Sequence, residues 1–302
     1  MVSVHDAFSI LKNSLPEYKE VQYTLLQARN YVLSQAINSP VNMPPFRQSA
    51  MDGFALCLHD TLEYDIIGEV KAGDTHQMTL LPGQAIKIFT GAAVPDSAQA
   101  VIQIEKTSVK EGIVYLQEQP KSGVNVRPIG EQISEGDLAL EKGTLLNAAA
   151  IGFLAGLGFT SVMVYKKPTI GIVITGNELV KPGSTLKYGK VYESNAIMLR
   201  SALNDAYFDA ITLYEVNDDF ENTKNKLHDA LSANDVVLVS GGISVGDYDF
   251  VARALKELEV ETLFYKVNQK PGKPLFTGKL QDKIIFALPG NPAACLTCFY
   301  VY

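Results

Sequence analysis

The chain has 302 residues, of which 47% are hydrophobic and 20% are charged, so it is long enough for two or three domains with apolar cores. Its formal net charge of -7 argues against general nucleic-acid binding, which depends on basic surfaces. The N-terminus shows no secretory signal, and no apolar run reaches the length of about 18 residues that a membrane span needs. We therefore expect a cytoplasmic protein with neither a membrane nor a nucleic-acid partner.

The chain begins with two stretches whose apolar residues recur at helical spacing, residues 4–15 and 24–37. Three prolines interrupt this pattern within residues 38–56. Short apolar or alternating runs, separated by glycine, proline and aspartate, then predict β-structure over residues 53–127. A helix rich in glycine and alanine, followed by a strand, is predicted over residues 141–165.

This order predicts a small β domain inserted into a helical one. We expect the helix within residues 141–165 to pack on the two N-terminal helices, giving an elongated helical linker domain of residues 1–40 and 131–166 with a β domain of residues 41–130 inserted. In residues 167–302, near-continuous apolar strands alternate with helices, as in a parallel sheet covered on both faces. The predicted fold class is α/β multidomain, with a three-layer, doubly wound, mostly parallel sheet domain beside the linker and the β domain.

Sheets of this kind bind ligands at the carboxyl ends of their strands. Loops with glycine, proline or acidic residues lie at four predicted strand ends, namely residues 174–179, 215–220, 240–250 and 288–294, and a fifth loop, residues 270–274, precedes the last strand. We expect all five loops to lie at one edge of the sheet. The helix that follows the first loop is expected to begin at Ser194 as its N-cap.

The loop of residues 240–250 has the composition of an anion site. Gly241 and Gly242 allow a sharp turn and a close backbone approach to a ligand, and free N–H groups before a helix form an anion nest. Lys270 and Lys273 add positive charge at the same edge.

Two aspartates, Asp247 and Asp249, follow these glycines and would repel a bare anion. The carboxylates indicate either a divalent cation or a hydroxyl-rich ligand, and a phosphate-bearing ligand together with Mg²⁺ is the simplest combination that satisfies both the anion nest and the carboxylates. The alternative is that the glycines merely form a strand-to-helix turn that Asp249 caps.

The predicted β domain has two polar stretches among apolar residues. Asp52 precedes Gly53 in residues 47–56, and Thr90 precedes Gly91 at a strand end. The Asp-Gly pair could equally form an ordinary turn. If both stretches are functional, they could face the sheet edge of another subunit.

The three cysteines, Cys57, Cys295 and Cys298, do not form a disulfide framework. Cys295 and Cys298 lie in an apolar, helical run, which favours buried core thiols over a redox or metal pair.

Seven segments occur in an order that is specific to one family and spans almost the whole chain: SAMDGFAL, IFTGAAVP, VRPIGEQISEGD, ITGNEL, SGGISVGDYDFV, KPGKPLFTG and LPGNPAA. In these segments the chain resembles the molybdopterin molybdenumtransferases, the MoeA-like proteins of molybdenum-cofactor biosynthesis, which are related to gephyrin. The resemblance implies a MogA-like fold for the sheet domain.

The resemblance also implies a transferase that inserts molybdate into adenylylated molybdopterin and releases AMP, assisted by Mg²⁺. It implies a homodimer whose active site lies between the sheet domain of one subunit and the β domain of the other. The adenylyltransferase of the same pathway is a further candidate partner.

Site residues are carried over by their position in these motifs. The resemblance implies that the catalytic residues are Asp52, Thr90, Glu178 and Asp249. It implies metal ligation by Asp249, Glu178 and Asp247. It implies substrate binding by Ser244, Gly241, Gly242, Asp218 (or its neighbour Asp219), Lys270, Lys273, Pro289 and Pro292.

The chain departs from the family pattern at three positions. Gln132 and Asn177 stand where the family usually has aspartate, and Gln99 replaces a third. Amide side chains keep hydrogen bonding but lose a charge, so we expect altered metal affinity or turnover.

The family has a C-terminal β-barrel domain after the final helix, which is absent from this sequence. We expect an incomplete molybdate site and a shortened chain, because the last helix reaches Tyr302 with no cap or polar tail. A second hypothesis is a non-catalytic molybdopterin-binding or scaffold protein of the gephyrin type, which the missing barrel disfavours. The segment of residues 1–166 argues against a third, an adenylyltransferase of the MogA type.

Overall fold

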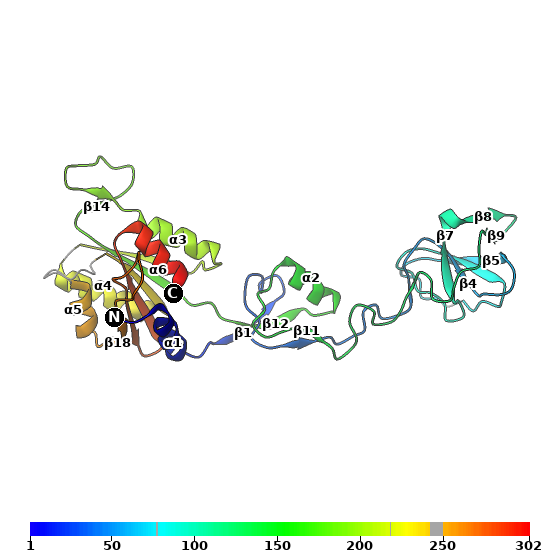
Figure 1. The fold of residues 1–302 in the computed structure, drawn as a ribbon, viewed down its shortest axis with the longest axis horizontal. Coiled ribbons are helices and arrows are strands. Elements are labelled where there is room, and N and C mark those ends of the chain that lie inside the picture. Colours follow the sequence, from blue (N-terminus) through cyan, green and yellow to red (C-terminus); the bar gives the residue numbers. More distant parts are fainter. Residues whose placement is uncertain (77, 218, 242–249) are drawn as a thin grey trace. The chain divides into compact units, whose positions relative to one another are not determined.

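The computed structural model describes residues 1–76, 78–217, 219–241 and 250–302 (Figure 1). The chain divides into two compact units. The first unit consists of Met1–Lys19 and Tyr165–Tyr302, and the second of Glu20–Val164.

The first unit is built on a six-stranded sheet. In spatial order its strands are β16 (Ile211–Val216), β13 (Ile170–Thr175), β17 (Val236–Ser240), β20 (Lys283–Leu288), β19 (Phe276–Leu280) and β18 (Glu261–Tyr265). The first four strands are parallel, and β19 and β18 are antiparallel to their neighbours. All six residues of β13 are buried, because helices cover both faces of the sheet.

Helices pack on both faces of this sheet, which confirms the predicted three-layer, doubly wound domain (Figure 1). One face carries α1 (Val4–Ser14), α3 (Asn195–Asp205) and α6 (Pro292–Val301). The other face carries α4 (Phe220–Ala233) and α5 (Phe250–Glu257). The short strands β14 (Leu179–Val180) and β15 (Val191–Tyr192) pair in parallel after β13.

The N-terminal region differs from the prediction. α1 begins with a capping box between Ser3 and Asp6, but its buried residues Ala7 and Leu11 pack in the core of the sheet unit rather than on a linker helix. The second predicted helix, residues 24–37, is wrong. It is a turn followed by bridges in which Leu33 pairs with Val164.

The reason is that the apolar residues of this stretch also suit a strand-like packing. Leu25, Ala28 and Leu33 are buried against α2 (Ala148–Gly156). Asn30 has a φ of 63°, which breaks a helical path. Tertiary pairing therefore outweighs the amphipathic period.

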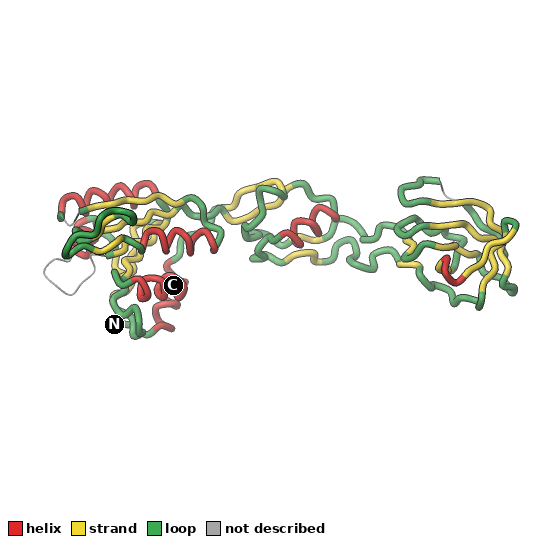
Figure 2. Tube along the Cα trace, turned by 90° about the horizontal axis from the view of Figure 1, so that it is seen from above, coloured by secondary structure: helices red, strands yellow, loops and turns green. Residues whose placement is uncertain are grey.

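Strands and loops make up most of the second unit (Figure 2). Its six-stranded sheet runs in the order β7 (Ala100–Gln103), β4 (Gly53–Leu56), β6 (Gln84–Ile88), β5 (Glu63–Val70), β9 (Ile113–Leu116) and β8 (Thr107–Lys110), with the 3-10 helix η1 (Ile104–Lys106) between β7 and β8. Three two-stranded pairs complete it, formed by β1 (Glu20–Thr24) with β12 (Ser161–Tyr165), β2 (Ile37–Asn38) with β11 (Leu138–Leu140) and β3 (Gln48–Ser49) with β10 (Val126–Arg127).

This unit contains separate apolar cores. One surrounds α2, and the others lie on the faces of the six-stranded sheet. The finer boundaries of a linker domain and an inserted β domain stay a prediction. Among the described residues, no helix combines the length and the apolar content needed to cross a bilayer.

Candidate functional site

The strand order creates a topological switch point between β13 and β17. From β13 the chain passes through α3 to β16 on one side, and from β16 through α4 to β17 on the other. Ligands bind at the carboxyl ends of the strands at such a point, because the flanking loops diverge there.

The predicted loops do share one edge of the sheet. The carboxyl ends of the four parallel strands lie at the same edge by definition. Residues 266–275, which connect β18 to β19, also lie there because Phe276 at the start of β19 is opposite Ala287 near the end of β20.

Three of these strand ends meet at Gly241. This residue has a φ of 91°, and a Cβ atom added to it would lie 2.3 Å from the carbonyl oxygen of Thr175 at the end of β13. A Cβ atom on Gly290, after β20, would lie 3.9 Å from the Cα atom of Gly241. Both the backbone angle and the close approach require glycine at position 241.

A cavity of about 340 Å³ opens where these strand ends meet, and we call it the switch-point cavity. Its lining includes Thr175, Glu178, Ser240, Gly241, Gly290 and Pro292. The carboxylate of Glu178 folds back over Gly176, since a Cβ atom there would lie 3.0 Å from both carboxylate oxygens. Glu178 is exposed, and within the described residues its carboxylate has no hydrogen-bond or ion-pair partner.

Asn195, which the sequence did not single out, joins two walls of this cavity. The residue is 8% exposed, and Nδ2 donates to the Ser240 hydroxyl oxygen (2.7 Å) and to the Gly290 carbonyl oxygen (2.9 Å). Because a carbonyl only accepts, the Gly290 contact fixes the orientation of the amide. Oδ1 has no hydrogen-bond partner among the described residues.

The start of α3 explains why Asn195 was missed. Ser194 occupies the N-cap position, but its side chain makes no capping hydrogen bond. The carboxylate of Glu193 instead accepts from the Ala196 N–H at 2.8 Å. A helix-start pattern indicates where α3 begins, but not that its first residue bridges two distant loops.

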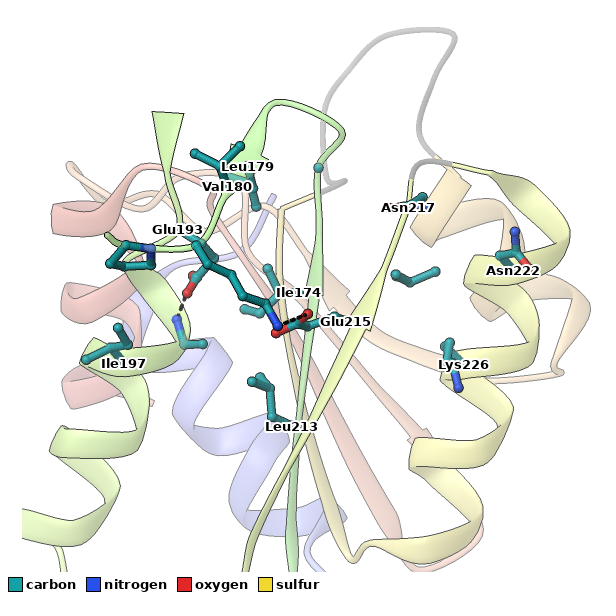
Figure 3. Close-up of a pocket in the computed structure, with 15 residues that line it drawn as sticks. Ile174, Leu179, Val180, Glu193, Ile197, Leu213, Glu215, Asn217, Asn222 and Lys226 are labelled. Atoms are coloured by element: carbon teal, nitrogen blue, oxygen red, sulfur yellow. Dashed lines mark hydrogen bonds and ion pairs between the residues drawn. The ribbon is translucent and has the colours of Figure 1, made fainter. Parts of the chain in front are cut away.

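A second cavity of about 680 Å³ lies at the ends of β13 and β16, and we call it the edge cavity (Figure 3). Figure 3 shows Ile197 on one side, Asn222 and Lys226 of α4 on the other, and Glu215 of β16 between them. The Lys181 Nζ atom lies 3.1 Å from a carboxylate oxygen of Glu215. The two cavities share Leu179 and Glu193 in their linings.

In the second unit, two predicted site residues contact each other. The Asp52 Oδ1 atom accepts hydrogen bonds from the backbone N–H and the hydroxyl of Thr90, each at 2.7 Å. The backbone hydrogen bond first, and the hydroxyl second, hold the pKa of Asp52 below its ordinary value. Asp52 therefore remains an anion under mildly acidic conditions.

The segments around these two residues are held together by Arg47 and by backbone pairing. The Arg47 guanidinium donates to the carbonyl oxygens of Pro95 (3.1 Å), Asp96 (3.3 Å) and Ala98 (2.8 Å). Ser49 exchanges backbone hydrogen bonds of 2.9 Å with residues 91 and 92. Sequence patterns identified both segments but not the hydrogen bonds from Arg47 that join them.

The loop of residues 270–274 packs against α6, and the predicted roles of its lysines stay predictions. Lys270 and Lys273 are exposed and line neither cavity. Gly272 is buried with a φ of 101°, and a Cβ atom on it would lie 2.6 Å from the Cys298 Sγ atom of α6. The Cys298 thiol donates to the Gly272 carbonyl oxygen at 3.6 Å, which anchors the loop on α6.

In the last loop, Pro289 is buried and Pro292 is the first residue of α6. The Asn291 side chain caps this helix by accepting from the Ala294 N–H at 3.1 Å. The neighbour of Asp218, Asp219, caps α4 by accepting from the Asn222 N–H at 2.9 Å.

Five predicted site residues lie outside the described residues, namely Asp218, Gly242, Ser244, Asp247 and Asp249. Their roles stay predictions. In the part of the chain that the structure describes, no three His, Cys, Asp or Glu side chains are grouped to hold a metal ion.

The three departures from the family pattern have different surroundings. The Gln99 Oε1 atom accepts from the Leu58 N–H at 2.8 Å, which is a structural role. The Asn177 carbonyl accepts from the Lys190 Nζ atom at 2.6 Å. Gln132 is exposed, and its backbone N–H donates to the Met43 carbonyl oxygen at 2.9 Å.

All three cysteines are free and buried, which confirms the prediction of core thiols for Cys295 and Cys298. Burial raises the pKa of Cys295 to about 12 and the pKa of Cys298 to about 11. Both side chains are therefore protonated core thiols and not nucleophiles.

Comparison with known families gives two matches that together cover most of the chain. Residues 2–158 match the MoeA N-terminal region (domain I and II), and residues 171–302 match the probable molybdopterin binding domain.

Individual proteins with molybdopterin in their names are also similar to the chain over nearly all of its length. The molybdopterin molybdenumtransferase of Haemophilus influenzae is 35% identical over 305 residues, covering 99% of this chain and 75% of the relative. The molybdopterin molybdenumtransferase of Staphylococcus epidermidis is 33% identical over 310 residues, covering 100% of this chain and 74% of the relative. The crystal structure of the molybdopterin biosynthesis MoeA protein of Pyrococcus horikoshii superposes with a TM-score of 0.82 at 30% identity, covering 100% of this chain and 78% of that one.

Proposed function

The chain belongs to the MoeA family of molybdopterin molybdenumtransferases, and we propose that it acts in molybdenum-cofactor biosynthesis by inserting molybdate into adenylylated molybdopterin with release of AMP. The observation that carries this proposal is the switch-point cavity, where Glu178, Gly241 and Gly290 meet at the ends of three parallel strands. We place the reaction there and the protein in the cytoplasm.

The backbone at this cavity suits the phosphoanhydride of an adenylylated substrate. Gly241 presents no side chain, so main-chain atoms can approach phosphate oxygens closely. Asn195 links the two walls that end in Ser240 and Gly290 through hydrogen bonds that need no substrate. Gly242 and Ser244 continue the first wall in the sequence, and we assign them to anion binding.

One described side chain, Glu178, has the chemistry of a magnesium ligand. Mg²⁺ prefers carboxylate oxygens, and the exposed carboxylate of Glu178 lines the cavity with no partner among the described residues. We propose that Asp247 and Asp249 complete the ligand set. When bound, Mg²⁺ neutralises the phosphates and polarises the phosphoanhydride for cleavage.

Lys270 and Lys273 are proposed to hold molybdate, because ammonium groups bind a tetrahedral dianion. Asp52 and Thr90 are proposed to reach the same reaction from the β domain of the second subunit of a homodimer. The hydrogen bonds from Thr90 lower the pKa of Asp52 and so favour its charged form, which suits a carboxylate that must act as an anion.

The test is molybdate-dependent release of AMP. The purified chain is supplied with adenylylated molybdopterin and Mg²⁺, with and without molybdate, and AMP and finished cofactor are measured. The proposal predicts that AMP release requires both molybdate and the divalent cation and stops on addition of a chelator. Binding of the substrate with no AMP release under any of these conditions would support the scaffold hypothesis instead.

A further inference from the structure

The loop that carries Lys270 and Lys273 is closed at its base by backbone hydrogen bonds. We call residues 267–275 the lysine loop. The Lys273 carbonyl oxygen accepts from the N–H groups of Val267 and Leu275, each at 3.0 Å. This closure fixes the two ends of the loop, and side-chain contacts fix the path of the backbone between them.

The Gln269 side chain lies inside the lysine loop. Its Nε2 atom donates to the Pro271 carbonyl oxygen at 3.0 Å. A Cβ atom added to Gly272 would lie 2.5 Å from the same Nε2 atom, so the amide packs directly on the backbone at this glycine. Gln269 therefore supports the stretch of backbone that lies between the two lysines.

The other end of the Gln269 amide is held from outside the loop. The hydroxyl of Tyr302, which follows α6, donates to the Gln269 Oε1 atom at 2.7 Å. Because a carbonyl only accepts, the Pro271 contact orients the amide with its oxygen toward the tyrosine. The Tyr302 ring packs against Phe8 and Phe264, with ring centroids 5.5 and 6.2 Å apart, so its position does not depend on the hydroxyl alone.

A second residue of α6 holds the same loop. The buried Cys298 thiol donates to the Gly272 carbonyl oxygen, and its Sγ atom lies 3.5 Å from the Gln269 Nε2 atom. The first residue of α6, Pro292, lines the switch-point cavity. This helix therefore connects the lysine loop to the loop that follows β20.

We propose that Gln269 is a positioning residue, which fixes the lysine loop so that Lys270 and Lys273 hold the same oxyanion. The inference rests on the proposed function, since that function assigns the two lysines to molybdate. Both lysines are exposed, and ordering a long side chain has an entropic cost that opposes binding. A fixed backbone reduces this cost, because only the side chains remain to be ordered when the dianion binds.

Tyr302→Phe tests this role, because it removes one hydroxyl and keeps the ring. Molybdate-dependent AMP release is measured with saturating adenylylated molybdopterin. The variant should raise KM for molybdate about fivefold while kcat changes little, since it loses one neutral hydrogen bond and neither lysine. Gln269→Ala should raise the same KM further, and AMP affinity measured by calorimetry should stay unchanged in both variants.

Tyr300→Phe is the matched control, because it removes the same group from the same helix. Tyr300 is 65% exposed, and within the described residues its hydroxyl makes no hydrogen bond. This variant should keep the wild-type KM for molybdate, and circular dichroism verifies the fold of all three variants. An unchanged molybdate KM in Tyr302→Phe or Gln269→Ala would overturn the inference, as would an equal rise in Tyr300→Phe.

Amide hydrogen exchange separates this inference from the proposed function. The N–H groups of Val267 and Leu275 report on the closure of the lysine loop, because both donate to the Lys273 carbonyl oxygen. If the wild-type chain releases no AMP, the proposed reaction is wrong, but exchange still decides the role of Gln269. Faster exchange of these two amides in Gln269→Ala than in the wild-type chain would support the role, and equal exchange would overturn it.

Discussion

The Asp52 Oδ1 atom accepts two hydrogen bonds from Thr90, one from its backbone N–H and one from its hydroxyl, each at 2.7 Å. These residues are 38 positions apart and belong to two different sequence motifs. Their contact joins the two motifs at one point and fixes the charge of the carboxylate. Both hydrogen bonds favour the charged form of Asp52 and lower its pKa.

Thr90→Val should raise the pKa of Asp52 part of the way toward 3.8, because it removes the hydroxyl donor but keeps the stronger backbone donor. A carboxylate whose pKa is lower in the folded state stabilises the fold at pH values above its unfolded-state pKa. This stabilisation is lost as the pH falls through the folded-state pKa. The stability difference between the two proteins should therefore vanish below that pH.

NMR titration of the Asp52 carboxyl carbon measures this shift. Thr90→Ser keeps a hydroxyl and should retain the wild-type pKa. An Asp52 pKa that is the same in Thr90→Val and the wild-type chain would show that the hydroxyl has no influence on the carboxylate.

Gly241→Ala should destabilise the sheet unit by about 3 kcal/mol, since it combines a strained φ with a clash of the new Cβ atom against the Thr175 carbonyl oxygen. Gly183→Ala is the matched control. Gly183 has a φ of 87°, but no atom lies within 4 Å of a Cβ atom added to it, so Gly183→Ala should lower the free energy of unfolding by only about 1 kcal/mol. Urea unfolding of both variants gives the comparison, and equal losses would contradict the close contact at Gly241.

Asn195→Ala should lower the free energy of unfolding by about 2 kcal/mol, because it leaves the Ser240 hydroxyl and the Gly290 carbonyl oxygen without their buried donor. Asn204→Ala on the same helix is the control, since Asn204 is exposed and should change stability by less than about 0.5 kcal/mol. AMP release should fall in Asn195→Ala and not in Asn204→Ala. Full stability in Asn195→Ala would show that this amide does not hold the two loops.

The cysteines should not react with thiol reagents in the native protein at about pH 8, because all three are buried and a thiolate is the reactive form. Burial raises the pKa of Cys295 to about 12 and of Cys298 to about 11, so these two stay protonated at this pH. A colorimetric thiol assay should detect no thiol in the native protein and all three thiols after denaturation in urea. Rapid modification of the native protein would contradict the buried placement.

The sheet unit could be predicted from the sequence because its strands are continuous apolar runs and its helices have a clear period, as in β13 and α4. The same reasoning failed for residues 24–37, where an amphipathic pattern was satisfied by strand pairing with Val164 instead of by a helix. The spacing of apolar residues indicates which residues are buried, but it does not indicate which segment of the chain they pack against.

The candidate site was predictable only where a motif marks it. Glu178 and Gly241 line the switch-point cavity, and Asp52 contacts Thr90, although that pairing needs the fold. Asn195 could not be found, because its two partners lie 45 and 95 residues further along the chain.

AMP release by Glu178→Gln tests the central claim most directly, namely that the chemistry occurs in the switch-point cavity. The change removes the charge of the one unpartnered carboxylate that the described residues place at this cavity, while Glu261→Gln removes an equivalent charge at the opposite edge of the sheet. We predict that Glu178→Gln lowers the rate by about 100-fold or more with little effect on stability, and that Glu261→Gln releases AMP at the wild-type rate. Equal rates in Glu178→Gln and the wild-type chain would contradict the assignment of the reaction to this cavity.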